Sequence, residues 1–365
     1  MKKMKAQFLF GKNLCDICAD SIIQLKNEKI IFYHFSYYYD IRICDEKTFK
    51  RLLEIDLYKI IYEYENGKKS NYSKTNKKYN NNKNCIKELH NGLILIGRDE
   101  YFIEINLSEN TFVPKIMKKF DNTILEINEL SDKRIIVITN ENIIIFKKEN
   151  EQYIIKNTYP IIKNWRMIPL SLTNKSYERF NQYFYCDELP NNRLLLKSFS
   201  IETKLRYPNP DREISKSKMI FIDMNEFKEI KSTELFDADA YYILLNNYLI
   251  IHTVNKTYTY DINSLEHLIN INFKETNSIL YQFNNNCIFS YSSVEAKNIL
   301  EVYIIENNKY IKQYEIESDK DKFEEYLLLW NDYVYQQDYK FLFPLRNGKI
   351  IILSRHSMHL LQLIE

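Results

Sequence analysis

The chain has 365 residues, of which 45% are hydrophobic and 15% aromatic, and its formal charge is +2. A charge this close to neutral excludes a global attraction to nucleic acid or to an anionic membrane. Six cysteines scattered over so long a chain predict reduced thiols rather than a disulfide framework. No apolar run approaches the roughly 18 residues of a membrane span, and the short run near the start is below the about 7–15 residues of a signal-peptide core. We therefore expect a cytoplasmic protein, with the nucleus as the alternative.

Short apolar runs separated by Asn or Asp turns recur seven times along the chain. In the clearest copy, residues 124–146, three runs rich in β-branched residues lie at 124–127, 135–139 and 143–146. Gaps this short cannot hold parallel crossovers, so each copy is expected to form an antiparallel meander. The first turns of the seven copies fall at Asn27, Asn91, Asp132, Asn192, Asn246, Asn285 and Asn347.

The spacing of the copies predicts the architecture. Asn91 and Asp132 are 41 residues apart and Asn246 and Asn285 are 39 apart, by subtraction of their positions, close to the roughly 40–45 residues of a four-stranded propeller blade. Fourth strands are expected at 111–116, 153–156 and 310–314. The sequence thus predicts an all-β, seven-bladed β-propeller of four-stranded antiparallel blades, forming a single domain over residues 1–365. Asn91-Gly92 and Asn347-Gly348 are typical of two-residue type I′ hairpin turns.

The two ends of the chain are expected to share a blade. The seventh copy has three strands, and an extra strand at residues 7–10 precedes the first copy. We expect this N-terminal strand to complete the last blade and close the ring, which leaves no open sheet edge between the first and last blades.

Four insertions interrupt the repeats, at residues 66–84, 162–185, 201–218 and 315–339. The first is polar and is expected to be disordered. Within the second we expect a short helix at 177–184, and the third is interpreted as a long polar hairpin. A helix at 318–331 is predicted in the fourth, because Ser318 and Asp321 can form a capping box ahead of apolar residues with helical spacing.

Motifs of the form I-x-x-L-x-N-x-x-I-I followed by I-x-I-x-[DN] match residues 22–45, 86–106 and 242–261. With them the chain resembles the degenerate WD-repeat group of β-propellers over nearly its whole length. It departs from that group in having no Gly-His pair ahead of the blades and no Trp-Asp pair at their ends, so the hydrogen-bonded tetrad of such families is not expected. The resemblance implies a ring-shaped platform for partner proteins and no chemistry.

An aromatic cluster at residues 33–39 is the first candidate binding site. Aromatic residues at a turn between two strands can anchor a partner peptide, because they carry much of the energy of protein interfaces. The alternative, which we favour, is a partly buried strand pair in a Tyr-rich chain. The candidate residues are Tyr33, Phe35, Tyr37, Tyr38 and Tyr39.

A basic loop within residues 66–84 is the second candidate. Six lysines without an acid can bind nucleic acid or an acidic partner by displacing counterions, whereas a solvated low-complexity insert is the favoured alternative. The lysines are Lys68, Lys69, Lys74, Lys77, Lys78 and Lys83.

Metal and catalytic motifs are weak. Cys15 and Cys18 form a C-x-x-C without a second pair to complete a zinc site, and His356 and His359, three apart on a strand, would point to opposite faces. The sequence has no nucleophile elbow and no glycine-rich phosphate loop. We therefore predict no catalytic residue, metal or cofactor.

These patterns predict a non-catalytic platform for protein–protein interaction, or a subunit of a larger assembly, whose partners are other proteins. The alternatives are an enzyme that uses the central channel of the propeller and a basic-surface binder of nucleic acid or anionic lipid.

Overall fold

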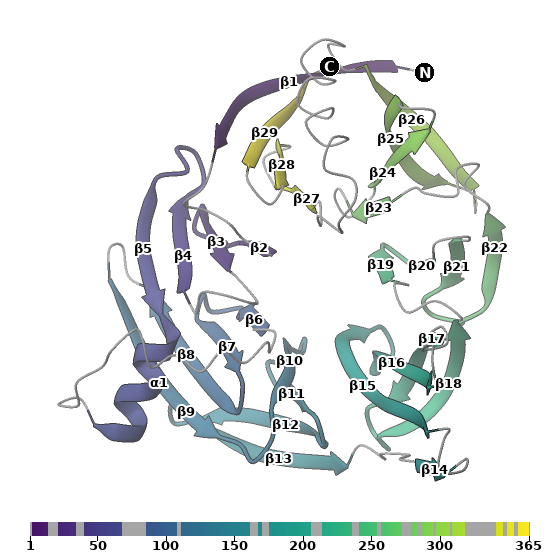
Figure 1. Ribbon diagram of the computed structural model, residues 1–365. Coiled ribbons are helices and arrows are strands. Elements are labelled where there is room, and N and C mark those ends of the chain that lie inside the picture. The colour runs from purple at the N-terminus through teal and green to yellow at the C-terminus, as the bar shows by residue number, and fades with distance from the viewer. Residues whose placement is uncertain are drawn as a thin grey trace. The chain divides into compact units, whose positions relative to one another are not determined.

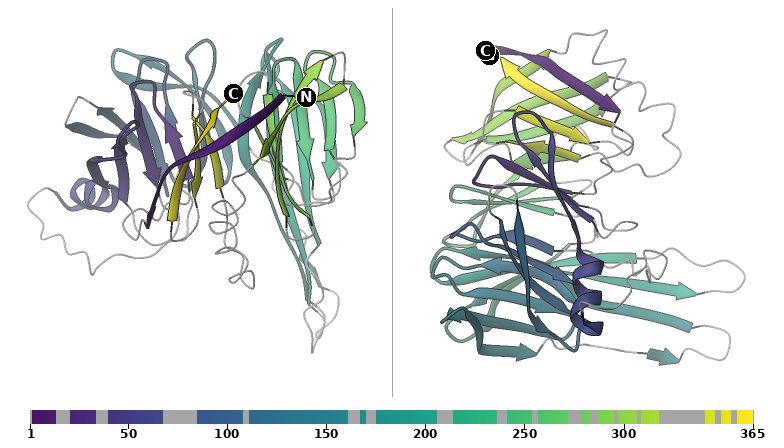
Figure 2. Two further views of the ribbon diagram at one scale, coloured as in Figure 1. Left: turned by 90° about the horizontal axis from the view of Figure 1, so that it is seen from above. Right: turned by 90° about the vertical axis from the view of Figure 1, so that its left-hand side faces the viewer.

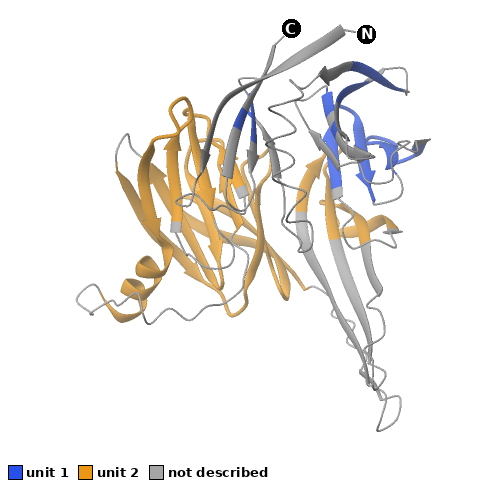
Figure 3. Ribbon diagram, turned by 45° about the horizontal axis from the view of Figure 1, so that its top comes forward, with its two compact units in different colours: residues 1–19, 239–365 blue, residues 20–238 orange. Residues whose placement is uncertain are grey.

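The computed structural model describes strands and one helix over seventeen stretches of the chain (Figure 1). The described residues divide into two compact units, one of residues 20–238 and the other of residues 1–19 with 239–365 (Figure 3). The described stretches are 2–13, 21–33, 40–67, 85–107, 111–160, 167–169, 175–205, 214–235, 241–253, 257–271, 279–282, 287–294, 297–306, 309–317, 341–345, 349–353 and 357–364.

The unit of residues 20–238 holds four antiparallel sheets, each with its strands in chain order. The first contains β2 (Ser21–Gln24), β3 (Lys29–Tyr33), β4 (Asp40–Asp45) and β5 (Arg51–Asp56). The second contains β6 (Cys85–Glu88), β7 (Ile94–Arg98), β8 (Tyr101–Leu107) and β9 (Phe112–Lys119). The third contains β10 (Ile124–Glu129), β11 (Ile135–Thr139), β12 (Asn142–Glu149) and β13 (Gln152–Pro160). The fourth has five strands: the short β14 (Met167–Pro169), followed by a four-stranded meander of β15 (Lys175–Leu189), β16 (Arg193–Leu205), β17 (Ile214–Asp223) and, as its fourth strand, β18 (Lys228–Leu235).

The other unit holds one four-stranded sheet and one eight-stranded sheet. The smaller contains β19 (Tyr241–Leu245), β20 (Tyr248–His252), β21 (Thr257–Asp261) and β22 (His267–Ile271). The larger has the order β23-β24-β25-β26-β1-β29-β28-β27. Its strands are β23 (Ile279–Gln282), β24 (Cys287–Val294), β25 (Lys297–Glu306), β26 (Lys309–Glu317), β1 (Lys2–Asn13), β29 (Ser357–Ile364), β28 (Lys349–Leu353) and β27 (Phe341–Pro344).

These sheets confirm the predicted meanders of four antiparallel strands. The three runs of the clearest copy become β10, β11 and β12, and the fourth strands expected after residues 111, 153 and 310 become β9, β13 and β26. β-branched residues dominate β10 to β12 because they pack well on a pleated surface. The predicted strand at 7–10 lies within β1, which pairs with β29 as expected.

Two local predictions were wrong. Residues 177–184 form part of strand β15 rather than a helix, because residues 177–179, 182 and 183 pair with β16. The turn at Gly92 is not type I′: only Gly92 of that pair has a positive φ, 83°, and its N–H donates to the carbonyl of Leu89. The turn is a three-residue hairpin loop whose last residue, Gly92, has a left-handed backbone conformation.

The structure also has a helix that the sequence analysis did not predict, α1 (Leu57–Asn66). It begins where the Asp56 carboxylate accepts from the Lys59 N–H at 2.9 Å, and it ends at Gly67, whose φ is 79°. The predicted hairpin of the third insertion is confirmed by the pairing of β16 with β17. Three predicted features lie outside the described residues: the helix at 318–331, the part of the 315–339 insertion after Glu317, and the turn at 347–348.

A β-bulge interrupts the pairing of the third strand with the fourth in every described meander. At each bulge, two consecutive residues of the third strand pair with two residues of the fourth strand that are separated by one extra, unmatched residue. The strand β1 has the same irregularity where it pairs with β29. Bulges protect an edge strand from pairing with another chain. The extra residues are Leu52, Met117, Lys156, Ile230, Leu268, Gln313 and, in β1, Leu9.

Neighbouring sheets within each unit bury aliphatic faces against each other. Ile43 and Ile103 meet in the core between the first two sheets, and Phe102 and Phe146, both fully buried, meet in the next. At that second interface Gly97 allows close approach, because a Cβ there would lie 2.4 Å from Cys85 Sγ and 2.6 Å from Ile124 Cγ2. Leu130 and Leu196 share the third core of this unit. In the other unit a smaller described core is built around Leu245 and Ile288.

An aspartate recurs at the start of turns between third and fourth strands. Asp45 accepts from the Thr48 N–H and hydroxyl, both at 2.7 Å, and Asp261 accepts from the Ser264 N–H at 2.7 Å. These bonds lower the pKa of both carboxyls, chiefly through the Thr48 side chain in one turn and the Ser264 backbone in the other. Each turn then places a buried apolar residue, Phe49 or Leu265, in the left-handed region, with φ of 55° and 59°.

Candidate functional site

Of the predicted aromatic site, the structure describes only Tyr33. Its side chain is 7% exposed and lies on β3 in the core shared with Ile31 and Ile41. The other members, Phe35, Tyr37, Tyr38 and Tyr39, lie outside the described residues. Tyr33 therefore supports the sheet, and the binding role of the cluster stays a prediction.

The predicted basic loop, with Lys68, Lys69, Lys74, Lys77, Lys78 and Lys83, also lies outside the described part of the chain. So do Cys15, Cys18 and His356, whereas His359 lies on β29 opposite Ile352. Where the chain is described, no three His, Cys, Asp or Glu side chains are grouped as metal ligands would be. The described cysteines, Cys44, Cys85, Cys186 and Cys287, are free thiols.

A polar cluster on β10 and β15, which belong to two neighbouring sheets, is the arrangement nearest to a catalytic one. Asn128 on β10 donates from Nδ2 to the carbonyl of Cys186 at 2.6 Å and to Asp187 Oδ1 at 3.3 Å, both on β15. Burial, followed by the nearby carboxylates of Asp187 and Glu126, raises the pKa of the Cys186 thiol well above its ordinary value. A thiol that keeps its proton is a poor nucleophile, so the geometry favours a structural role in joining the two strands.

Three glutamates at corresponding positions of β6, β10 and β15 connect neighbouring sheets. Each accepts a hydrogen bond from a backbone N–H in the first turn of the preceding sheet: Glu88 from Lys26 at 3.0 Å, Glu129 from His90 at 2.5 Å and Glu188 from Ser131 at 2.5 Å. Such charge-assisted bonds satisfy turn N–H groups and fix how neighbouring turns meet. In the sequence, each of these glutamates is followed by a leucine and lies three residues before an Asn or Asp. This repeated pattern was visible, but no role was predicted for it.

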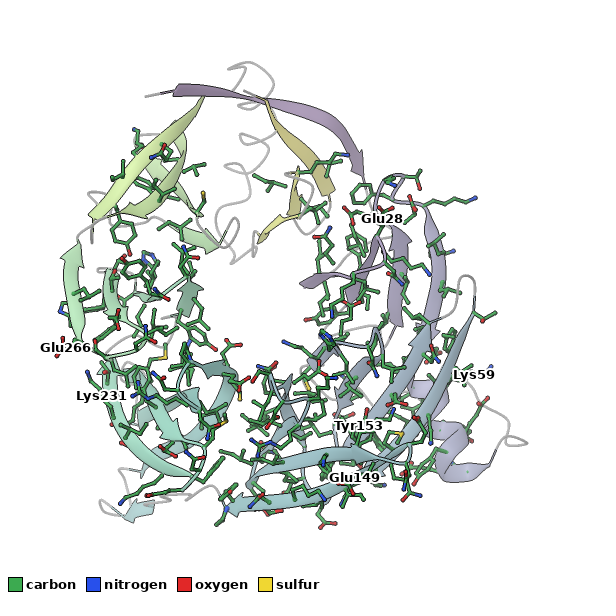
Figure 4. The ribbon with its side chains drawn as sticks, turned by 180° about the vertical axis from the view of Figure 1, so that it is seen from behind. Glu28, Lys59, Glu149, Tyr153, Lys231 and Glu266 are labelled. Carbon is green, nitrogen blue, oxygen red and sulfur yellow. The ribbon has the colours of Figure 1, made fainter. Side chains whose placement is uncertain are left out.

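A buried ionic network lies between the second and third sheets of the same unit. Glu104 on β8 is 8% exposed, and its Oε2 accepts from Tyr153 Oη at 2.6 Å and from Lys148 Nζ at 2.8 Å (Figure 4 labels Tyr153). Burial and then the Glu104 carboxylate raise the pKa of Tyr153. For Lys148, burial opposes the charge, but the bonds to Glu104 and Glu151 outweigh it and raise its pKa. With both pKa values raised, Tyr153 keeps its proton and Lys148 its charge at neutral pH, which suits a fixed structural link.

The helix α1 is attached to the second sheet by a related network nearer the surface. Glu65 accepts from the hydroxyl of Tyr101 and, at 2.6 Å, from Lys119 Nζ. The bond to Lys119 and then that to Tyr101 lower the pKa of Glu65, while burial and the bond to Glu65 raise the pKa of Tyr101 to about 12. Lys119 belongs to β9, so α1 covers part of that edge strand.

Exposed apolar side chains gather on the fourth strands. Among the described residues, every large hydrophobic side chain that is substantially exposed lies on a fourth strand or on α1, with Val113 of β9 the most exposed at 67%. Exposed apolar surface is typical of protein-binding surfaces. The residues are Val113, Ile154, Ile155, Ile230 and Ile311 on strands and Tyr64 on the helix.

No helix in the described stretches is long and apolar enough to cross a membrane. The predicted compartment has no structural test and stays a prediction.

Comparison with solved structures identifies the fold. The chain is similar to the β-propeller domain of Cps50 (Swd1) from Myceliophteria thermophila, with a TM-score of 0.53, 7% identity, and coverage of 98% of this chain and 99% of that one. It is also similar to a catalytically inactive virginiamycin B lyase from Staphylococcus aureus bound to quinupristin, with a TM-score of 0.52, 11% identity, and coverage of 99% and 100%. No family model and no curated protein sequence matches the chain. At such low identities the likeness concerns architecture only. The chain has the fold of a β-propeller, and the predicted WD-repeat-like propeller is confirmed at that level.

Proposed function

We propose that this protein is a closed, seven-bladed β-propeller that serves as a non-catalytic platform for protein–protein interaction. The blade count is supported by the sheets: four in one unit, one four-stranded sheet in the other, and two meanders within the eight-stranded sheet, which together make seven. Closure is supported by β1, which supplies the fourth strand beside β29 and has a bulge like those of the other fourth strands.

The observation that carries the platform role is the exposed apolar surface of the fourth strands. Val113, Ile154 and Ile155 expose 67%, 40% and 41% of their surface in one unit. The bulges on the same strands limit indiscriminate strand pairing while side chains stay available. Partner proteins with apolar contact residues are the class that such a surface fits.

A substitution series tests this role. Val113→Thr, Ile154→Thr and Ile155→Thr together keep β-branched residues on the strands but replace apolar contacts by hydroxyls. The matched control changes polar positions of the same strands, with Lys115→Ser, Asn157→Ser and Thr158→Ser. We expect proteins that cross-link to the wild-type chain in its own cell to be lost from the first variant and kept by the control. Identical cross-linked partners for both variants would contradict the platform role of these strands.

The non-catalytic part of the proposal is supported by the Cys186 thiol, which keeps its proton, and by glutamates already engaged by backbone N–H groups. One structural neighbour is a lyase bound to quinupristin, which provides a direct test. We expect quinupristin to keep its chromatographic retention and its fragmentation pattern when incubated with the purified protein, because a lyase that opens a ring by elimination leaves the intact mass unchanged. Conversion that disappears on Asp187→Asn would favour an enzyme instead.

A further inference from the structure

The strand β1 pairs with two different strands and joins two meanders into one sheet. Residues 5–13 pair antiparallel with β29, and residues 2–5 pair in parallel with β26 (Figure 2 shows β1 beside β29). All other ladders described in this structure are antiparallel pairs of consecutive strands. The β26–β1 ladder is therefore an added connection rather than a part of the repeat.

The register of the parallel half matches basic residues with acidic ones. Lys3 is opposite Glu315, Met4 is opposite Ile316 and Lys5 is opposite Glu317. Opposite charges at facing positions of neighbouring strands stabilise a sheet, whereas like charges destabilise it. The pattern Lys-Met-Lys against Glu-Ile-Glu is therefore complementary at three successive positions.

A further acid makes a cation at this edge favourable. Glu315 is also opposite Glu301 on β25, so two like charges are cross-strand neighbours. Glu301 is bound by Lys312 Nζ at 2.5 Å and by the Tyr303 hydroxyl at 2.6 Å. In the register of β1 with β26, Lys3 takes the position opposite Glu315, so a residue of opposite charge follows Glu315 on the next strand.

The antiparallel half matches apolar residues with apolar ones. Ala6 is opposite Leu363, Phe8 is opposite Leu361 and, after the bulge, Phe10 is opposite Leu360. Association of apolar residues is only weakly affected by salt, in contrast to attraction between opposite charges. The two halves of β1 thus define a segment with lysines at alternate positions followed by aromatic residues.

We propose that the edges of β26 and β29 form a strand-binding site specific for such a segment, filled by β1 in the same chain and open to exchange with β1 of a second copy. Unpaired strand edges template the addition of an extended segment, and exchange of an identical element between copies needs no new contacts. The site depends on the pairing of β1 alone, and it stands whether or not the fourth strands bind other proteins.

Peptide exchange into the full-length chain tests the site. A fluorescein-labelled peptide of residues 1–13 is incubated with the full chain, and binding is followed by anisotropy. We expect saturable binding that the unlabelled peptide displaces and that weakens severalfold between about 50 and 500 mM salt, because the parallel half is screened. A peptide that never exchanges, at any concentration or after prolonged incubation, would overturn the proposal.

Charge reversal tests its specificity. Glu315→Lys with Glu317→Lys should weaken the wild-type peptide about tenfold or more, as expected for two cross-strand pairs turned repulsive. The same variant should bind the peptide carrying Lys3→Glu and Lys5→Glu more tightly than the wild-type chain does. If the variant is unstable, the reversed peptide against the wild-type chain gives the same comparison. Equal affinities for the two peptides would rule out the charge code.

Discussion

Two inter-sheet interfaces, one in each unit, place a tyrosine at the same position and give it different partners. Tyr153, the second residue of β13, donates to the Glu104 carboxylate on the third strand of the preceding sheet at 2.6 Å. Tyr310, the second residue of β26, shares a hydrogen bond of 2.7 Å with the Thr259 hydroxyl, again on the third strand of the preceding sheet. The position is thus common to both interfaces, whereas the chemistry of the partner is not. A charged partner also needs Lys148 as counter-ion.

The two interfaces should differ most in the free energy of unfolding that is lost when the hydrogen-bond partner of the tyrosine is removed. We expect Glu104→Ala to lower the free energy of unfolding by about 3 kcal/mol, because Lys148 and Tyr153 lose their acceptor in a largely buried place. Thr259→Ala should cost about 1–2 kcal/mol, since it leaves one neutral hydroxyl unsatisfied. Urea unfolding of both variants checks this, and equal losses would show that the ionic network adds nothing beyond a neutral bond.

Close packing at the charged interface gives the next effect. Gly97→Ala should cost about 2 kcal/mol, because the new Cβ meets Cys85 Sγ and Ile124 Cγ2 well inside contact distance. Adding Cys85→Ala should recover part of the loss by making room on one side. The midpoint of thermal unfolding for the single and double variants is the measurement, and an unaffected single variant would mean that the two sheets can move apart freely.

Removing only the hydroxyls compares the two tyrosines directly. Tyr153→Phe should cost about 2 kcal/mol, as expected for a bond to a charged group, and Tyr310→Phe about 1 kcal/mol. Hydrogen exchange of amides in β13 and β26 would locate each loss. The reverse order would contradict the view that the carboxylate makes the first bond stronger.

The smallest effect should be a change in stability at low pH, caused by one turn aspartate in each unit. The pKa values of Asp45 and Asp261 are lowered in the folded protein. Their stabilising contribution is therefore present above the ordinary pKa of an aspartate and is lost as the pH falls through the lowered value. Asp45→Asn or Asp261→Asn should make the loss of stability between about pH 5 and 3 less steep. An unchanged acid profile in both variants would mean that these turns do not contribute to acid unfolding.

Local features of the fold were predictable from particular residues. The runs at 124–127, 135–139 and 143–146 became strands because β-branched residues favour a pleated surface whatever their neighbours are. The stretch at 177–184 was wrongly predicted as a helix, since it becomes a strand by pairing with β16. The helix α1 was missed because its apolar residues need the first two sheets to pack against.

Little of the candidate site was predictable. Tyr33 was proposed as a binding residue and lies in the core, because β3 is buried on both faces from Ile30 to Tyr33. Glu88, Glu129 and Glu188 were visible as repeated Glu-Leu pairs, yet their acceptor role needs the turn of a neighbouring sheet about 60, 40 and 60 residues away.

By itself, the sequence determined the strands, their turns and their grouping into repeats, because these depend on the side-chain period and turn chemistry of a few consecutive residues. The tertiary structure alone decided which polar groups are buried together, as for Glu104 and Lys148, and which edges β1 completes. Those contacts join residues far apart in the chain, where no local preference acts and only the packing of sheets sets the partners.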